Sequence, residues 1–280
     1  MVSSIPILFS PTGTKVHWNN KGHFAVAGST GSGKSTFLKY FVYQLSLHSS
    51  PCDELYILDY KNSSDWRYFR GHENYFSYDK CQEGFQKIYT EFEDRLGGRS
   101  DKENICYVVI EEFASFQASI RTKKERDELQ YQLGQLLRLS RAVGNDGGFR
   151  LILCAQQLSA NLFGGGTADR DNIGARLLLG GGATTEGRKM LFEISDEDIL
   201  PTNSPTGKGY YQEQGGRIQK VLSPMIKNFD TLGSQRVIKM MDRSKSINRS
   251  HNVGLPPIGG SSALGEWKPS VGEMSGNNHT

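Results

Sequence analysis

The eight residues from Gly28 to Ser35 constrain this chain more than any other stretch. They read Gly-Ser-Thr-Gly-Ser-Gly-Lys-Ser and fit the phosphate-binding pattern G-x-x-x-x-G-K-[ST]. Such a loop must connect a strand to a helix. Residues 23–27 predict a short buried strand before it, and residues 36–47 carry apolar side chains at helical spacing after it. We therefore predict a nucleotide-binding loop at the start of an α/β core.

The residue types in this loop indicate which groups would meet a nucleotide. Glycines let backbone N–H groups turn towards a phosphate, and the N-terminus of the following helix adds a partial positive charge. Lys34 is expected to reach the β and γ phosphates, and the Ser35 hydroxyl to hold Mg²⁺. The expected ligands are ATP and Mg²⁺, and the predicted nucleotide contacts are Gly28, Ser29, Thr30, Gly31, Ser32, Gly33, Lys34, Ser35 and Thr36.

Strand-like and helical patterns alternate along most of the chain, which favours an α/β fold with a mostly parallel sheet flanked by helices. The predicted strands after the loop cover residues 55–58, 105–110, 150–155, 175–179, 209–212 and 218–222. The predicted helices cover residues 83–96, 123–143 and 186–192. We expect residues 62–79 to be irregular, because they are polar and aromatic without a period.

Three regions are expected from this reading of the chain. Residues 1–22 predict an edge hairpin, residues 23–230 the core, and residues 231–280 a short helix followed by a tail. The tail is rich in Ser, Gly and Asn and lacks an apolar period, so we expect it to be disordered. Its one large apolar residue is Trp267.

The composition of the chain says more about its expected cellular location than about its binding partner. A net charge of +3 over 280 residues is too small to establish a nucleic-acid partner by itself. The four cysteines are scattered, which favours neither a disulfide framework nor a zinc site and fits a reduced compartment. There is no signal-peptide pattern at the start and no apolar run of about 18 residues. A cytoplasmic protein without its own membrane span is expected.

A second motif follows the apolar run from Ile105 to Ile110, which ends in Glu111 and Glu112. A buried strand that ends in acidic residues is the Walker B pattern of phosphate-loop ATPases. Glu111 stands where an aspartate usually orders the Mg²⁺ water shell, so Ser35 and Glu111 are the predicted metal residues. Glu112 is expected to polarise the attacking water. The glutamate at 111 has a longer side chain than aspartate, and this departure bears on the metal geometry.

Taken together, the motifs resemble the FtsK/SpoIIIE family of hexameric DNA-translocating ATPases over about residues 20–226. The resemblance implies a RecA-like phosphate-loop core, duplex DNA as substrate and a ring of identical subunits, with six the expected number. It rests on the phosphate loop and on segments 58–61, 108–114, 139–144, 151–156, 172–176, 186–188 and 221–224. The run from Arg141 to Gly144, followed by a strand that ends in Gln156, is its most diagnostic part.

The resemblance also implies roles for single residues. Arg141 matches the arginine that family members insert into the neighbouring subunit's ATP site, and Gln156 matches their γ-phosphate sensor. At 100° per residue from Leu129, Arg141 lies roughly 120° and Arg138 roughly 180° from the apolar stripe of the helix, so Arg138 is the second candidate. With Lys34, Glu111 and Glu112, Arg141 and Gln156 complete the predicted catalytic set.

Arg170 and Arg188 match basic residues on the two loops with which the family touches DNA phosphates. The family's arginine after the sensor glutamine is Gln157 in this chain, which weakens one expected phosphate contact. No winged-helix DNA-reading domain or membrane-anchored region is recognisable, so a relaxase or a membrane-anchored protein is an expected partner. Two alternatives stay open: a conjugative coupling or packaging ATPase that moves single-stranded DNA or protein, and a slow ATP-gated adaptor.

Overall fold

The computed structural model describes residues 4–140, 142–143, 148–157, 171–180, 188, 191–192 and 205–243. The strands in these residues form one sheet of ten, in the order β2-β1-β10-β9-β8-β3-β7-β6-β4-β5. Their bounds are β1 Ile5–Phe9, β2 Lys15–Trp18, β3 His23–Ala27, β4 Glu54–Asp59, β5 Tyr75–Ser77, β6 Ile105–Glu111, β7 Gly148–Ala155, β8 Ile173–Leu179, β9 Lys208–Glu213 and β10 Gln219–Leu222.

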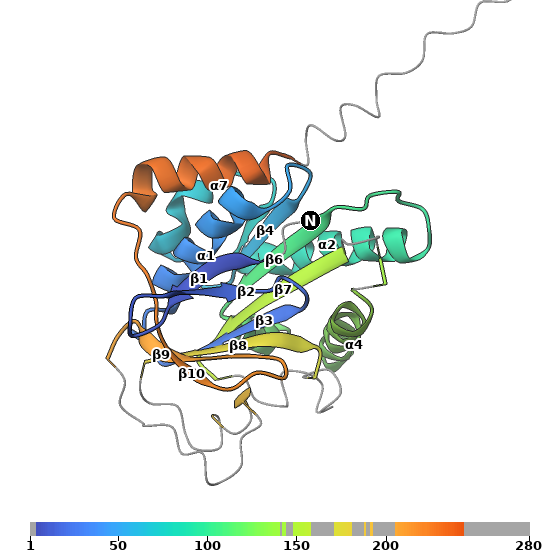
Figure 1. Cartoon of the computed structure of the whole chain (residues 1–280). Helices are drawn as coiled ribbons and strands as arrows, with labels where there is room; N and C mark the ends of the chain where they lie inside the picture. The colour runs from blue at the N-terminus through green and yellow to red at the C-terminus, as the bar shows by residue number, and fades with distance from the viewer. Residues whose placement is uncertain are drawn as a thin grey trace, which may run out of the picture.

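The sheet has a parallel part and an antiparallel part (Figure 1). Strands β8, β3, β7, β6, β4 and β5 run parallel, and β9, β10, β1 and β2 extend the β8 edge by antiparallel pairing. The predicted α/β fold with a mostly parallel sheet is confirmed. The β1–β2 hairpin forms as predicted, and its pairing with β10 makes it part of the same sheet.

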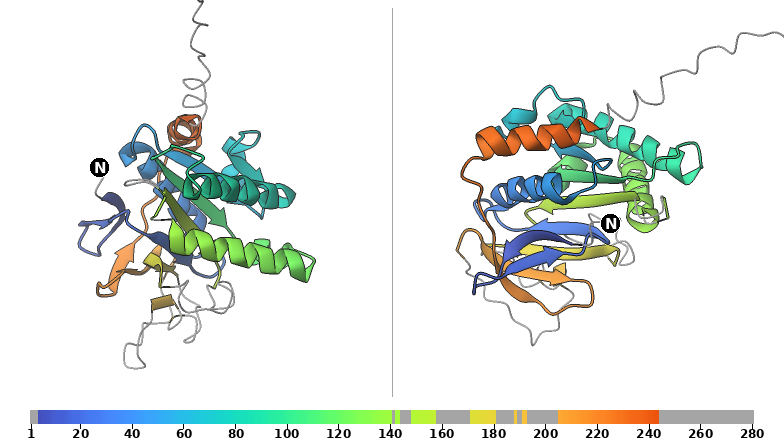
Figure 2. Two further views of the ribbon diagram at one scale, coloured as in Figure 1. Left: turned by 90° about the vertical axis from the view of Figure 1, so that its right-hand side faces the viewer. Right: turned by 45° about the horizontal axis from the view of Figure 1, so that its top comes forward.

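Helices cover both faces of the sheet, as Figure 2 shows. One apolar core joins the sheet to α2 (Cys81–Leu96), α3 (Phe113–Ser119) and α4 (Lys123–Leu139). The other joins the opposite face to α1 (Lys34–His48), η1 (Ser64–Phe69) and α7 (Ser234–Met241). The described chain also has the short turns η2 (Tyr78–Lys80) and η4 (Phe229–Gly233).

The helices predicted at residues 36–47, 83–96 and 123–143 form, and most of the helix predicted at 186–192 lies outside the described residues. In α1 the five predicted core residues, Phe37, Leu38, Phe41, Val42 and Leu45, are all buried. The start of α4 is fixed by a capping box in which Thr122 and Glu125 bond each other's backbone N–H groups. Helix α4 ends at Leu139 rather than at residue 143. A Cβ on Gly148 would lie 1.8 Å from the Ser140 carbonyl oxygen, so the returning chain passes too close for another helical turn.

Two segments contain elements that were not predicted. Residues 62–79, expected to be irregular, contain η1 and the edge strand β5, which pairs with β4 in parallel. The three-residue strand is too short for a period to show. The segment after the acidic pair forms α3, in which Phe113 and Phe116 face the core one turn apart. Leu96, predicted on the buried stripe of α2, is 47% exposed at the helix end.

Candidate functional site

The predicted phosphate loop lies between the end of β3 and the start of α1, as expected. Gly31 and Gly33 have φ values of +79° and +101°, a backbone region that glycine adopts without strain. Gly28 is required by space, because a Cβ there would lie 2.4 Å from the Leu179 carbonyl oxygen. The glycine spacing therefore reflects both backbone conformation and close packing.

The loop is packed against the end of β8 and the turn before β9. The Gly207 N–H donates to the Ser32 carbonyl oxygen at 2.9 Å, and the Thr206 hydroxyl donates to the Gly31 carbonyl oxygen at 3.0 Å. A Cβ on Gly180 would lie 2.6 Å from the Ser32 Cβ. The glycine at 180, to which the sequence assigned no role, thus allows β8 to support the loop.

Lys34 points back over the loop that precedes it. Its Nζ donates to the carbonyl oxygens of Gly28, at 2.6 Å, and Ser29, at 3.0 Å. The side chain is 9% exposed, so its charge is held in one place. These two carbonyl oxygens occupy positions at the ammonium that phosphate oxygens could take.

The acidic pair at the end of β6 faces this loop. The Ser35 hydroxyl donates to Glu111 Oε1 at 2.7 Å, which joins the phosphate loop directly to the Walker B strand. Glu112 Oε2 forms an ion pair with Lys61 Nζ at 2.5 Å. Glu112 also has a left-handed backbone, with φ 59° and ψ 49°, at the start of α3. Such a conformation costs about 1–3 kcal/mol in a non-glycine residue and is found mostly at functional sites.

Burial controls the electrostatics of Glu111. Its side chain is 5% exposed, and this burial raises its pKa to about 7, against the lowering effect of the bond from Ser35. Asp59 lies opposite Glu111 in the β4–β6 register and adds to the rise by charge repulsion. Burial likewise raises the pKa of Asp59. A nearby cation would favour the ionised form of both carboxylates.

Four residues that the sequence did not assign to the site come from the end of β4 and from η1: Asp59, Lys61, Asp65 and Trp66. Asp59 Oδ2 accepts the Ser63 N–H at 2.7 Å, and Asp65 forms an ion pair with Lys39 of α1 at 2.5 Å. The Trp66 indole N–H donates to Glu111 Oε2. The sequence contains a pattern that could have indicated Asp59 and Lys61. Both lie just after the apolar residues of β4, as the acidic pair lies just after the apolar residues of β6.

These groups surround one pocket of about 400 Å³. Phosphate-loop residues from Thr30 to Thr36 form one wall, and Lys61, Glu111 and Glu112 form the facing wall. Asp65 and Thr206 also line it. Two lysine ammonium groups and three carboxylates therefore line a volume at the carboxyl ends of the parallel strands, where open α/β sheets bind ligands.

The other predicted site residues fall into three groups. Gln156 is exposed at the end of β7, beside the Walker B strand, and its carbonyl oxygen accepts the Gly28 N–H at 3.3 Å. Arg141 and Arg170 lie outside the described residues, while the second candidate Arg138 is exposed on α4. Arg188 is 4% exposed and lies near Tyr210. The expected contact of Arg188 with DNA stays a prediction.

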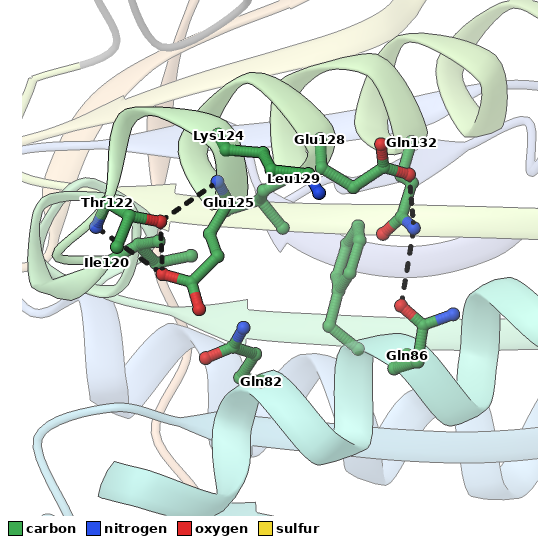
Figure 3. Close-up of a pocket in the computed structure, with 10 residues that line it drawn as sticks. Gln82, Gln86, Ile120, Thr122, Lys124, Glu125, Glu128, Leu129 and Gln132 are labelled. Carbon is green, nitrogen blue, oxygen red and sulfur yellow. Dashed lines mark hydrogen bonds between the residues drawn. The ribbon is translucent and has the colours of Figure 1, made fainter.

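A second pocket, of about 480 Å³, lies between α2 and α4 (Figure 3). Phe85, Ile120 and Leu129 contribute apolar surface, and Gln132 of α4 bonds to Gln86 of α2 across it at 3.3 Å. It shares no residue with the pocket at the phosphate loop. It is therefore a groove between two packed helices and separate from the nucleotide chemistry.

Comparison with known proteins relates the phosphate-loop region of the chain to one family. The model of the FtsK/SpoIIIE family matches residues 6–68, which run from β1 through the phosphate loop, α1 and β4 into η1. Over these residues the chain resembles the FtsK/SpoIIIE family, whose members are phosphate-loop ATPases. The matched segment includes Lys34 and Ser35 and also Lys61 and Trp66.

Solved structures share the fold of this chain at low sequence identity. The pCW3 conjugation coupling protein TcpA, in a monomer form with ATPγS, superposes with a TM-score of 0.64 at 18% identity over 86% of this chain and 71% of TcpA. The cytoplasmic domain of the Thermomonospora curvata type VII secretion ATPase EccC gives 0.61 at 18% identity, over 85% of this chain and 31% of EccC. EssC of Geobacillus thermodenitrificans (ATPases 2 and 3) superposes with a TM-score of 0.57 at 17% identity. The match covers 91% of this chain and 52% of EssC.

The chain spans about a third of the EccC structure and about half of the EssC structure. No curated protein matches it in sequence. Among the described residues, no helix combines the length and apolar character needed to cross a bilayer.

Proposed function

We propose that this chain is the motor of an ATP-dependent DNA translocase, in which a ring of identical subunits couples ATP hydrolysis to the movement of duplex DNA. The observation that carries the proposal is the bond between Ser35 and Glu111, which brings the phosphate loop and the acidic pair to one pocket. The family match supports a motor of this type, and the coupling protein TcpA, a conjugation protein, shares the fold. Transfer or maintenance of a plasmid or mobile element is the expected setting.

Binding of ATP would begin at the phosphate loop. The backbone N–H groups of residues 28–36 would hold the phosphates at the N-terminus of α1. Lys34 would exchange its bonds to the Gly28 and Ser29 carbonyl oxygens for bonds to the β and γ phosphates. The loop is already supported by Gly180 and Gly207, so little reordering of the backbone is needed.

The residues present fit Mg²⁺. The hydroxyl of Ser35 and a carboxylate oxygen of Glu111 lie 2.7 Å apart, and both are hard oxygen ligands. The described residues include no cluster of three or more His, Cys, Asp or Glu side chains that could hold a metal alone. That suits Mg²⁺, which typically takes one or two protein ligands and completes its shell with phosphates and water. When bound, the ion would neutralise charge on the phosphates.

Hydrolysis needs a base for water beside the terminal phosphate. Glu112 would accept the water proton, while its ion pair with Lys61 and its capping position at α3 hold the carboxylate towards the pocket. Lys61, 45% exposed and on the wall opposite Lys34, is placed to meet a phosphate oxygen. Gln156, next to Gly28, would sense the γ phosphate.

The remaining positive charge would come from a second subunit. We expect Arg141 to reach the neighbour's ATP site and stabilise the transferred phosphoryl group. Arg141→Ala should lower the turnover number about 1,000-fold or more, the range seen for such arginines, and leave ATP affinity within about twofold. Rates and equilibrium binding of ATPγS measured on the same preparation check this.

Wild-type protein mixed with excess Arg141→Ala protein should lose more activity than dilution predicts, because each wild-type site then lacks its neighbour's arginine. Arg121→Ala, at an exposed arginine before α4, serves as the matched control, and Arg138→Ala tests the second candidate. Equal loss of binding and turnover in the Arg141→Ala variant would show that the arginine acts within its own subunit.

The test of the proposed function is ATP turnover with and without DNA. Purified chain with duplex DNA should hydrolyse ATP at least about tenfold faster than chain alone, and the stimulation should fall steeply as salt rises, because phosphate contacts release counterions. Stimulation should not depend on sequence, since phosphate contacts do not read bases. ATP turnover that is unchanged by duplex DNA at low salt would reject the translocase.

A protein substrate is the second candidate. The shared fold of the secretion ATPases EccC and EssC favours it, and one EccC structure contains a signal sequence peptide. The nucleotide chemistry would be identical, so the substrate must be distinguished by stimulation. Parallel assays with duplex DNA, single-stranded DNA and no DNA separate the candidates: preference for single strands supports a conjugative coupling ATPase, and indifference to both supports a protein substrate.

A further inference from the structure

The backbone at Glu111 does not by itself fix the position of the side-chain carboxylate. Its side chain has one more rotatable bond than the aspartate usual at this place, so the strand alone does not fix where the carboxylate lies. An unrestrained side chain loses rotamer entropy when it becomes ordered to bind a ligand. In this chain Glu111 is nevertheless 5% exposed, with its carboxylate oriented at the start of α1.

Two donors from different elements hold the two oxygens of this carboxylate. Ser35 of α1 donates to Oε1 at 2.7 Å, and the indole N–H of Trp66 in η1 donates to Oε2. Hydrogen bonds to a charged acceptor are roughly twice as strong as those between neutral groups. Because each of the two oxygens accepts a bond from a different element, the two bonds together fix the last torsion of the glutamate.

Trp66 is itself held firmly enough to serve this purpose. It is fully buried, and its ring packs against Phe69 with centroids 5.8 Å apart. The Ser63 side chain caps η1 by accepting the Asp65 N–H at 3.0 Å. The Asp65–Lys39 ion pair joins η1 to α1, the helix that also carries Ser35. The indole therefore has a fixed position relative to the phosphate loop.

We propose that Trp66 is a positioning residue for Glu111: its indole N–H holds one carboxylate oxygen so that the other meets Ser35 where Mg²⁺ is bound with ATP. The glutamate at 111 thereby occupies the place that a shorter aspartate would reach unaided. This role rests on the proposed ATPase function, and it assigns Trp66 an effect on the metal dependence of nucleotide binding that a residue of the apolar core would lack.

The experiment measures binding of ATPγS to the full chain at increasing Mg²⁺, by calorimetry or with a fluorescent analogue. Trp66→Phe keeps an aromatic ring and removes the N–H donor. It should leave affinity in EDTA unchanged and raise the Mg²⁺ concentration for half-saturation about tenfold, the size expected for one lost bond to a charged group. Trp18→Phe is the matched control, because Trp18 is equally buried in β2 among Phe24, Phe41 and Tyr107.

A double-mutant cycle tests the mechanism. Glu111→Asp withdraws the carboxylate from the indole, so Trp66→Phe should have little further effect on Mg²⁺ dependence in that background. Additive effects of the two substitutions, or a Trp66→Phe variant with the same Mg²⁺ dependence as Trp18→Phe, would overturn the positioning role. A wild-type chain that does not bind ATPγS with Mg²⁺ would instead reject the proposed function, and this role with it.

Fluorescence provides a readout that does not depend on the stability of the Trp66→Phe variant. The sequence has three tryptophans, so Trp18→Phe with Trp267→Phe leaves Trp66 as the reporter. Its emission should change when Mg²⁺ is added with ATPγS, and Glu111→Gln should abolish that change. Emission that responds equally with Glu111→Gln would show that the indole does not report on this carboxylate, and would reject the proposal.

Discussion

Replacing Lys34 with alanine will weaken ATP binding about 100-fold or more and reduce turnover to background, because charge-assisted bonds from one ammonium to phosphate contribute about 3 kcal/mol. The structure adds a second reason. Lys34 Nζ bonds to the carbonyl oxygens of Gly28 and Ser29, so the side chain also holds the first turn of the loop. Equilibrium binding of ATPγS and steady-state hydrolysis, measured on the same preparation, check this prediction.

The control for this variant is Lys21→Ala. Lys21 is an exposed lysine in the connection from β2 to β3, away from the nucleotide pocket, and its replacement changes net charge by the same amount. It should leave binding and hydrolysis unchanged. If Lys34→Ala binds ATPγS with wild-type affinity, the pocket beside the phosphate loop is not where the triphosphate binds.

The sequence predicted the parts of this site that depend on local pattern. The β3–loop–α1 unit is continuous in the chain, and each of its glycines has a conformational or packing reason that the motif already contains. The end of β6 was equally predictable, because an apolar run that stops at two acidic residues marks the end of a buried strand. The meeting of Ser35 and Glu111 then follows from the general rule that parallel strands present their carboxyl ends at one edge.

The parts of the site that the sequence did not predict depend on the order of the strands in the sheet and on a segment without apolar periodicity. Asp59 lies opposite Glu111 only because β4 pairs with β6, which the sequence does not reveal. Trp66 reaches Glu111 through η1, a single short turn fixed by the Ser63 cap and the Asp65 ion pair. Contacts of this kind are long-range, between residues 45 positions apart, and no spacing rule encodes them.

The predicted DNA contacts show that an isolated charged residue in a sequence is weak evidence for a DNA-binding site. An arginine with no basic neighbours in the sequence can be exposed at the surface or buried in a contact, and the sequence does not distinguish the two. In the structure Arg188 is buried in the single chain, and Arg170 lies outside the described residues, so both DNA contacts stay predictions. Evidence for DNA must therefore come from stimulation and salt dependence.

Replacing Glu112 with glutamine is expected to separate chemistry from binding. Glutamine has nearly the same shape as glutamate but accepts a proton poorly, so turnover should fall about 100- to 10,000-fold, the usual contribution of a general base. ATP affinity should stay within about twofold, since Lys34 and Ser35 are unchanged and lie on the other wall of the pocket. Single-turnover hydrolysis and ATPγS binding provide the two measurements.

The interpretation of Glu112→Gln depends on Lys61, which loses its anionic partner. Lys61 is 45% exposed, so water can solvate its ammonium and the fold should keep its melting temperature within a few degrees. Glu83→Gln, an exposed substitution in the first turn of α2, is the control for the loss of one charge. Hydrolysis that survives in Glu112→Gln would assign the base to another carboxylate. A parallel loss of ATPγS binding would mean that the Lys61–Glu112 pair builds the pocket and does not take part in the chemistry.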